Sequence, residues 1–392
     1  MFKRNAKVAL VHDWFLSNSI SGAEKVTVKI DSYLSKHFSL PHLYSLTENI
    51  SKKNLNIFSG RNINTSFIQK LPYGSTNVQR YLMLIPFAIE QLNLNEYDLI
   101  ISSSHIAAKG VLSSPDQLHI SYIHTPMRYA WDQMNTYIDN SFYKKIGLEL
   151  PLRYLLFKLR SWDFISGNRP DFLLSNSSFT ARRIKKYWGL NSEIIFPPVE
   201  IERFNFDKNR SNFYLTVNRL VPNKRIDLLI EAFNKLNLPL IVIGDGPEKK
   251  ELNKKAKKNI IFYENVSNQF IEELMSKCRA FVYSGVEDFG IAPVEAIASG
   301  APVIGLGKGG LLDTVKCFNN LSKGEIATGV LFKNQTLSDI VDTINWFEDN
   351  KIWKKFNRED MHIFSKKFNL ENFNSKLDNF IQREWNTFNR KK

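Results

Sequence analysis

Residues 279–296 read RAFVYSGVEDFGIAPVEA, and this stretch predicts how a large part of the chain folds. Its first half, RAFVYSGV (279–286), is a short apolar run that predicts a buried strand and the loop after it. Pro293 suits the first turn of a helix, where its missing N–H leaves no hydrogen bond unmade. The stretch is therefore expected to form a strand, a loop that carries Glu287 and a helix that carries Glu295.

The spacing of these two glutamates also bears on function. In one continuous helix they would lie about 12 Å apart along the axis and about 80° apart around it, which suits no shared task. In a loop and a helix, they instead flank the free N–H groups of Gly290, Ile291 and Ala292, which favour an anion. The simpler alternative is that Glu295 complements the helix dipole and Glu287 is solvated.

The same alternation of apolar runs and amphipathic segments extends along the whole chain. Continuous apolar strands between helices are typical of parallel sheets covered on both faces, so we expect an α/β fold. The expected strands are 7–12, 97–104, 118–123, 172–177, 193–196, 212–220, 238–246, 259–266 and 279–286. Helices are expected from Ala23, from Ile226, through the leucines between 152 and 162, and over 368–388.

A pair of prolines, Pro197 and Pro198, interrupts this alternation near the middle of the chain. The alternation of strands and helices starts again after it. We therefore expect two doubly wound, Rossmann-like domains, 1–197 and 198–369, with a C-terminal helix (370–392) that packs back on the first domain. Loops at the strand ends of both domains would then face one cleft.

Composition narrows the class of protein. The 392 residues include only two cysteines, which excludes a disulfide scaffold and fits a reducing compartment. The sequence shows neither a secretory signal nor an apolar run long enough to span a bilayer, so we expect a cytoplasmic protein. The net charge of +14 suits nucleic acid, an anionic membrane or a phosphorylated ligand. It is spread along the chain, and no nucleic-acid-binding module is recognisable.

Two further loops of the second half carry candidate site residues. Arg219 and Lys224 flank a proline-containing turn at a strand end, where both cations can reach one phosphate group. Gly244 and Gly246 follow the next strand and allow a ligand to approach the backbone closely. Each pair also has a simpler interpretation, as surface cations and as turn glycines.

The first half offers two comparable positions. Gly22 lies in a loop before a helix and either cradles a phosphate or makes a tight turn with Ser21 as the cap. His124 stands at a strand end, with Thr125 as the expected N-cap of a helix and Pro126 at its first position. A single histidine is commonly structural, but one at the C-terminal end of a parallel strand is a candidate site residue.

In their order along the chain, these motifs resemble the retaining glycosyltransferases of family 4, which have the GT-B architecture. The resemblance is strongest over 213–316, through NRLVPNKRID, IGDGPEKKEL, the E-x7-E pattern from Glu287 to Glu295, and KGGLLDTV (308–315). VHDWFLSNSISGAEKV, SSSHIAAKGV and ISYIHTPMRYAWD are similar to bacterial transferases that build surface polysaccharides, several of them mannosyltransferases.

The resemblance implies a role for each candidate. Arg219 and Lys224 would clamp the donor diphosphate, Glu287 would hydrogen-bond the transferred sugar, and Glu295 would hold the ribose hydroxyls. The implied catalytic residues are His124, Arg219, Lys224 and Glu287. The implied donor-binding residues are Gly22, Gly244, Gly246, Val266, Phe289, Gly290, Ile291 and Glu295. Asp13 and His105 are acceptor-side candidates. Ser21 stands where the family often has another glycine.

The resemblance also implies the substrates. The expected donor is GDP-mannose, with UDP-glucose or UDP-N-acetylhexosamine as the alternative. The expected acceptor is a glycan on a polyprenyl diphosphate, at the cytoplasmic face of the inner membrane. Retention in the family is ascribed to front-face attack, in which a donor phosphate oxygen accepts the acceptor's proton. No cofactor is expected, and metal-independent transfer is predicted because the sequence has no D-x-D motif and no Cys/His cluster.

Membrane contact and rival classes of protein stay open at this point. The basic, aromatic segments 143–162 and 182–189 are candidates for contact with anionic lipid, although their amphipathic pattern favours packing within the first domain. A nucleic-acid binder would explain the charge alone. A catalytically silent sugar-binding or scaffold protein would explain the fold, but the intact set of Arg219, Lys224, Glu287 and Glu295 argues against it.

Overall fold

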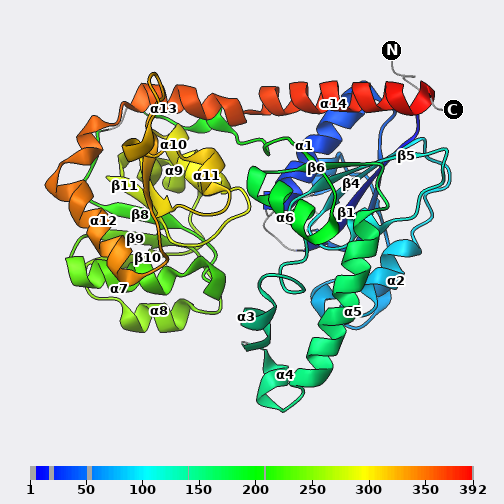
Figure 1. The fold of residues 1–392 in the computed structure, drawn as a ribbon, viewed down its shortest axis with the longest axis horizontal. Coiled ribbons are helices and arrows are strands. Elements are labelled where there is room, and N and C mark those ends of the chain that lie inside the picture. Colours follow the sequence, from blue (N-terminus) through cyan, green and yellow to red (C-terminus); the bar gives the residue numbers. More distant parts are fainter. Residues whose placement is uncertain (1–5, 17–21, 51–54, 140, 207–208, 391–392) are drawn as a thin grey trace. The chain divides into compact units, whose positions relative to one another are not determined.

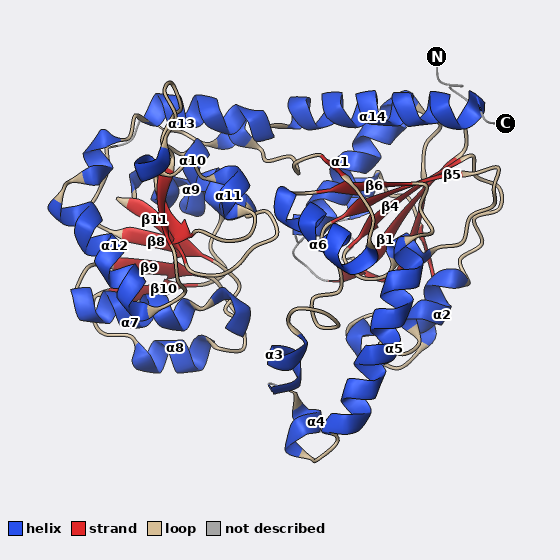
Figure 2. Ribbon diagram, in the orientation of Figure 1, coloured by secondary structure: helices blue, strands red, loops and turns tan. Residues whose placement is uncertain are grey.

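A computed structural model describes residues 6–16, 22–50, 55–139, 141–206 and 209–390. The chain divides into two compact units, one of residues 1–196 and 374–392 and one of residues 197–373. Each unit is a parallel sheet with helices on both sides (Figure 1, Figure 2). The predicted α/β class with two doubly wound sheets is thereby confirmed.

The sheet of the first unit has the strand order β3-β2-β1-β4-β5-β6-β7, and all neighbouring strands are parallel. The strands are β1 (Val8–Leu16), β2 (His42–Asn49), β3 (Ile63–Thr65), β4 (Leu99–Ser104), β5 (Leu118–Ile123), β6 (Phe172–Ser175) and β7 (Glu193–Ile194). The helices are α1 (Gly22–His37), α2 (Ile85–Glu90), α3 (Met134–Asp139), α4 (Phe142–Lys145), α5 (Glu149–Gly167), α6 (Ser178–Trp188) and α14 (Leu370–Arg390).

Two hydrophobic clusters hold helices against this sheet. Leu152, Leu156 and Leu159 of α5 are buried in the larger cluster, which confirms the helix predicted from these leucines. Ile184 and Trp188 of α6 are buried in the smaller one. Every residue of β4 and β5 is buried, as expected for central strands covered on both faces.

The second unit repeats this design with the strand order β10-β9-β8-β11-β12-β13, again all parallel. The strands are β8 (Tyr214–Val217), β9 (Leu240–Ile243), β10 (Ile260–Tyr263), β11 (Ala280–Tyr283), β12 (Val303–Leu306) and β13 (Gly329–Phe332). The helices are α7 (Ile226–Leu236), α8 (Lys249–Lys255), α9 (Asn268–Lys277), α10 (Ile291–Ala298), α11 (Leu311–Thr314), α12 (Leu337–Asp349) and α13 (Arg358–Ser365).

The C-terminal part of α14 makes polar contacts with the first unit. The Tyr33 hydroxyl donates to Asp378 over 2.6 Å, and Arg383 donates to Glu193 over 2.6 Å. Within the described part of the chain, none of the helices is both long enough and apolar enough to cross a membrane.

One local prediction is wrong. The chain turns after β5, and the next helix is α3, so Thr125 does not cap a helix that begins at Pro126. Its hydroxyl instead accepts a hydrogen bond from Arg183 over 2.5 Å, which replaces the expected bond from a helical N–H group. By contrast, Glu287 lies in a loop and Pro293 in the first turn of α10, as predicted.

Candidate active site

The loop between β11 and α10 is held in place through its backbone. Glu287 forms a parallel bridge with Gly309, and the N–H of Gly310 donates to the carbonyl of Glu287 over 2.8 Å. A Cβ at Gly309 would lie 2.4 Å from that carbonyl oxygen, and one at Gly310 would lie 2.4 Å from Asp288 O. The two glycines of the KGG segment are therefore required by this close backbone packing, and they fix the loop that presents Glu287.

Lys224 and Glu287 lie together although 62 residues separate them in the sequence. Lys224 belongs to the 3-10 turn Pro222–Lys224 after β8, and its ammonium group forms an ion pair with the Glu287 carboxylate. The Tyr283 hydroxyl donates to the same carboxylate and lies 3.3 Å from Lys224 Nζ. Both charged side chains are partly exposed, 18% for Lys224 and 17% for Glu287. Tyr283, the last residue of β11, is a site residue that the sequence did not single out.

The two glycines after β9 support the loop that carries Arg219. A Cβ at Gly244 would lie 1.8 Å from Asn218 O, and one at Gly246 would lie 2.3 Å from Leu220 O. Because these glycines have no side chain, the backbone of the Arg219 loop can pack closely against them. The sequence had suggested another use of this space, the close approach of a ligand. Arg219 itself is exposed. A donor-binding role for Gly244 and Gly246 stays a prediction.

Glu295 of α10 is held by a residue that sequence reasoning missed. Arg203 donates from Nη2 to Glu295 Oε1 over 2.9 Å, and its Nη1 lies 3.5 Å from Glu272 Oε1. The guanidinium also stacks on the Phe204 ring, 4.6 Å from its centroid. Arg203 lies five positions after Pro198, in a segment that the sequence marked only as a boundary between domains. Glu295 is therefore oriented by a cation, with 15% of its side chain exposed.

The other donor-binding candidates fall in different environments. Gly290 caps α10 with φ at 93°, a left-handed conformation that favours glycine, and Ile291 begins the helix. Val266 lies half-buried in the loop between β10 and α9. The Phe289 ring is buried against Phe368, 5.5 Å between centroids, so its backbone is better placed for a ligand than its side chain. Gly22 is the first residue of α1, and Ser21 lies outside the described residues.

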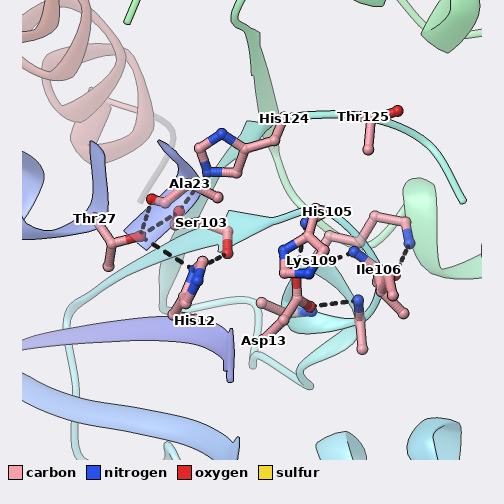
Figure 3. A network of polar contacts seen from close by, with 12 residues as sticks. His12, Asp13, Ala23, Thr27, Ser103, His105, Ile106, Lys109, His124 and Thr125 are labelled. Carbon is pink, nitrogen blue, oxygen red and sulfur yellow. Dashed lines mark hydrogen bonds and ion pairs between the residues drawn. The ribbon is translucent and has the colours of Figure 1, made fainter. Parts of the chain in front are cut away.

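In the first unit, a buried polar network surrounds His124 (Figure 3). His124 directly follows β5, and its Nε2 lies 2.8 Å from Ser103 Oγ. Ser103 Oγ is also 2.7 Å from Thr27 Oγ1, and the Ser103 carbonyl lies 2.8 Å from His12 Nδ1. Burial lowers the pKa of His12 to about 4 and holds that of His124 well below its ordinary value. Both imidazoles are therefore neutral near pH 7, and His124 can donate or accept a hydrogen bond but carries no charge.

Asp13 is fully enclosed by the loop after β4. Its carboxylate accepts hydrogen bonds from the backbone N–H groups of residues 105–108, over 2.5 to 3.0 Å. His105 Nδ1 lies 2.7 Å from the same carboxylate. Burial alone would raise the pKa of Asp13, but His105, its hydrogen bonds and His12 outweigh burial and lower it. Asp13 thus orders the loop that carries His105, whose ring is 24% exposed, and acceptor contact by either residue stays a prediction.

Within the ranges that the structure describes, no group of three or more His, Cys, Asp and Glu side chains is arranged to hold a metal ion. Cys278 is buried and Cys317 is partly buried, and both are free thiols. Metal-independent transfer stays a prediction.

Two parallel α/β units, with cations and carboxylates gathered where strands of the second unit end, define a protein of the GT-B architecture. Residues 199–367, almost the whole second unit, match the family described as glycosyl transferases group 1. Over these residues the chain is therefore similar to the group 1 glycosyl transferases. Its finer assignment to family 4 stays a prediction.

Curated relatives are similar to this chain in sequence, and a solved structure is similar in fold. An alpha-1,3/1,6-mannosyltransferase of Kluyveromyces lactis is 24% identical over 79% of this chain and 71% of its own length. An O-antigen chain mannosyltransferase of Salmonella typhimurium is 29% identical over 43% of this chain and 48% of its own length. Several alignments, like the second, span about half of the relative's length. The structure of HepE of Anabaena, a complex with UDP and glucose, has a TM-score of 0.66 at 15% identity and covers 96% of this chain and 100% of its own. The chain thus resembles polysaccharide mannosyltransferases in sequence and a GT-B protein in fold.

Proposed function

We propose that this protein transfers a hexose, mannose from GDP-mannose, to a growing glycan on a polyprenyl diphosphate, with retention of configuration. The observation that carries the proposal is the cluster of Lys224, Glu287 and Tyr283 at the strand ends of the second unit. The cluster combines a cation with a carboxylate that can accept hydrogen bonds from sugar hydroxyls, and α10 begins four residues after Glu287, with N–H groups that favour an anion. The similarity to two mannosyltransferases favours mannose as the sugar.

The roles proposed for the side chains follow from their chemistry. Lys224 and Arg219 stabilise the charge that develops on the departing diphosphate, because fixed cations act most strongly where charge appears in the transition state. Glu287 exchanges its contact with Lys224 for hydroxyls of the sugar, and Glu295 binds the ribose. His124, a neutral imidazole held by Ser103, donates to or accepts from the sugar near the reacting carbon. This arrangement needs no protein nucleophile and no metal ion, so we propose metal-independent transfer.

One observation favours a second donor. The structural neighbour from Anabaena was solved with UDP and glucose. UDP-glucose or UDP-N-acetylhexosamine is therefore the alternative donor for the same site. We further propose that the protein acts at the cytoplasmic face of the inner membrane, where a polyprenyl-linked acceptor is accessible, through a peripheral contact with the bilayer.

A panel of GDP- and UDP-sugars with a thermal-shift readout tests the donor. We expect GDP-mannose to raise the unfolding temperature and UDP-sugars to leave it unchanged. If UDP-glucose alone raises the unfolding temperature, the donor is UDP-glucose and not GDP-mannose. Transfer is then measured with and without excess chelator. Activity that is lost in chelator and restored by a divalent ion contradicts metal independence, and an inverted anomeric signal in the product contradicts retention.

The same panel separates the enzyme from a silent sugar-binding protein. A silent protein would bind a donor and show neither transfer nor slow donor hydrolysis. Loss of glycan assembly in cells that carry Lys224→Ala or Glu287→Ala supports the enzyme, and unchanged assembly supports the silent protein.

A further inference from the structure

Helix α5 has two apolar faces, and only one of them faces the core. Leu152, Leu156 and Leu159 point into the larger hydrophobic cluster, which is the packing that the sequence favoured for this segment. The opposite face is solvent-exposed and still apolar. Its exposed fractions are 77% for Leu150, 62% for Tyr154, 51% for Phe157, 47% for Phe164 and 58% for Ile165.

The spacing of these five residues places them on one side of the helix. At about 100° per residue, positions 150, 154, 157, 164 and 165 fall within a stripe about 100° wide. A helix at the surface of a globular unit ordinarily carries polar residues there. This exposed apolar stripe, which Ser161 interrupts, therefore indicates a surface that contacts something else.

The short helix α4 and the turn after it add further exposed apolar residues before the N-terminal end of α5. Ser141 caps α4 by accepting from the Lys144 N–H over 3.3 Å, and the segment after it is almost fully exposed. Phe142, Tyr143, Ile146 and Leu148 have exposed fractions of 68%, 51%, 49% and 43%. We call these four residues and the five of α5 the α4–α5 apolar face. Figure 1 shows α4 at the end of α5 that projects away from the sheet of the first unit.

The charges beside the α4–α5 apolar face are mostly positive. Residues 142–165 contain five Lys and Arg and two Asp and Glu. Of the two acids, Glu149 pairs with Arg153 over 2.9 Å, and Asp163 is buried. Lys145 is exposed, and Lys158 Nζ lies 5.4 Å from the centre of the Tyr154 ring. A lysine that lies along an aromatic face keeps its stem on apolar surface while its ammonium group reaches outward.

We infer that the α4–α5 apolar face docks on an anionic phospholipid bilayer. Aliphatic and aromatic side chains on one side of a projecting helix suit insertion at the level of the headgroups, and the flanking lysines suit anionic phosphates. This inference names the surface for the membrane contact included in the proposed function. It depends on lipid binding alone, so it holds or fails separately from donor binding and transfer.

The full chain is tested by co-sedimentation with vesicles of phosphatidylcholine, either pure or mixed with phosphatidylglycerol. We expect binding to the mixed vesicles and little binding to the neutral ones. The variant Leu150→Ser/Tyr154→Ser/Phe157→Ser should weaken binding by at least about a hundredfold, because three exposed apolar side chains no longer enter the bilayer. Lys145→Gln/Lys158→Gln should weaken it roughly fivefold for each lysine and reduce its sensitivity to salt.

Matched controls carry the same changes on exposed positions of the second unit. Ile261→Ser/Ile363→Ser removes two apolar side chains that are 50% exposed each, and Lys250→Gln/Lys254→Gln removes two exposed lysines of α8. Both should bind vesicles like the unchanged protein. Unfolding temperatures confirm that every variant is folded, and the donor thermal shift tests the proposed function independently.

Two outcomes would overturn the inference. One is equal vesicle binding by the unchanged chain and the triple serine variant, which would place the lipid contact elsewhere. The other is a dimer in sedimentation velocity that the triple serine variant converts to a monomer, without vesicle binding by either. In that case the face is covered by a second copy of the chain.

Discussion

In the first unit the carboxylates of Asp13 and Asp163 are fully buried, whereas in the second unit that of Glu287 is 17% exposed. Asp163 accepts from Lys109 over 2.7 Å and from the indoles of Trp131 and Trp188 over 2.8 Å each. Asp13 accepts from four backbone N–H groups. Glu287 instead meets one lysine and one tyrosine at a surface that water reaches.

This difference in burial distinguishes carboxylates that fix the backbone around them from carboxylates that can exchange their hydrogen-bond partners for a ligand. A buried carboxylate with all its hydrogen bonds made cannot leave them without a large desolvation cost, so it fixes the backbone around it. A partly exposed ion pair is worth little in stability, so a ligand can replace either partner at low cost. We therefore assign ordering roles to Asp13 and Asp163, and ligand contact to Lys224 and Glu287.

The largest expected effect on stability comes from Asp163→Asn. The change leaves the Lys109 ammonium, 2% exposed, without its counter-charge, so we expect a loss of about 3–5 kcal/mol in the free energy of unfolding. Urea denaturation measures it. The control is Asp139→Asn, which breaks the surface pair with Lys144, where the acid is 58% exposed, and should cost less than about 1 kcal/mol. Equal losses in the two variants would remove the distinction between buried and exposed carboxylates.

The next effect is catalytic. Lys224→Ala should lower kcat about 100- to 1000-fold, since the proposed transition state loses a fixed cation. The free energy of unfolding should fall by less than about 1 kcal/mol because the ion pair is partly exposed. Transfer kinetics and urea denaturation on the same preparation measure both. Lys249→Ala, which breaks an ion pair with Glu264 in the same unit, is the control and should leave kcat unchanged. A Lys224→Ala variant that is fully active but unstable would contradict the assignment of ligand contact.

Much of this fold could be predicted from sequence because central parallel strands are short apolar runs between helices. β1 and β4 to β11 were found in this way. β2, with the sequence HLYSLTEN, was not predicted because polar residues interrupt its apolar pattern, and β13 spans only Gly329–Phe332. β2 and β13 are positioned by pairing with β1 and β12, respectively. A local sequence pattern carries no information about such pairing.

The residues of the candidate site also fall into those that local sequence signals predict and those that only distant contacts reveal. Glu287, Lys224 and His124 lie at strand ends and carry local signals of turn and helix start. Arg203 and Tyr283 were missed because their importance comes from contacts. Arg203 meets Glu295 across 92 residues of sequence. The backbone packing of Gly244 was missed for the same reason, because its neighbour is the carbonyl of Asn218 on another loop.

A third effect depends on pH and concerns the first unit. Burial lowers the pKa of His12 to about 4 and that of His119 to about 3. The unfolded chain binds protons at these positions from about pH 6.5 downward, but the folded chain does not. The contribution of these two neutral histidines to the free energy of unfolding is therefore fully present above pH 6.5 and decreases as the pH falls toward 4. Between pH 7 and pH 5, each histidine is expected to cost about 2 kcal/mol.

Hydrogen exchange at pH 7 and pH 5 locates this loss. We expect β4 and β5 to lose protection at pH 5 more than β11 and β12 of the second unit. His119→Gln should reduce the pH dependence of the unfolding free energy by about 2 kcal/mol over this range. The exposed His37→Gln serves as the control substitution. Equal loss of protection in both units would show that acid does not act through these buried histidines.

The smallest expected effect tests whether Arg203 prepares Glu295 for a ligand or competes with it. Arg203→Met removes from Glu295 a charge-assisted hydrogen bond of 2.9 Å. If Arg203 orients the carboxylate for the ribose, KM for the donor rises about tenfold with kcat unchanged, because a bond of this type contributes about 1.5 kcal/mol or more. If Arg203 occupies the ribose position, KM falls instead. Glu272→Gln removes only the longer contact of 3.5 Å and should change KM less in either case. A rise would give Glu295 a fixed partner, as Asp13 has in the first unit, whereas a fall would make it an exchangeable group like Glu287.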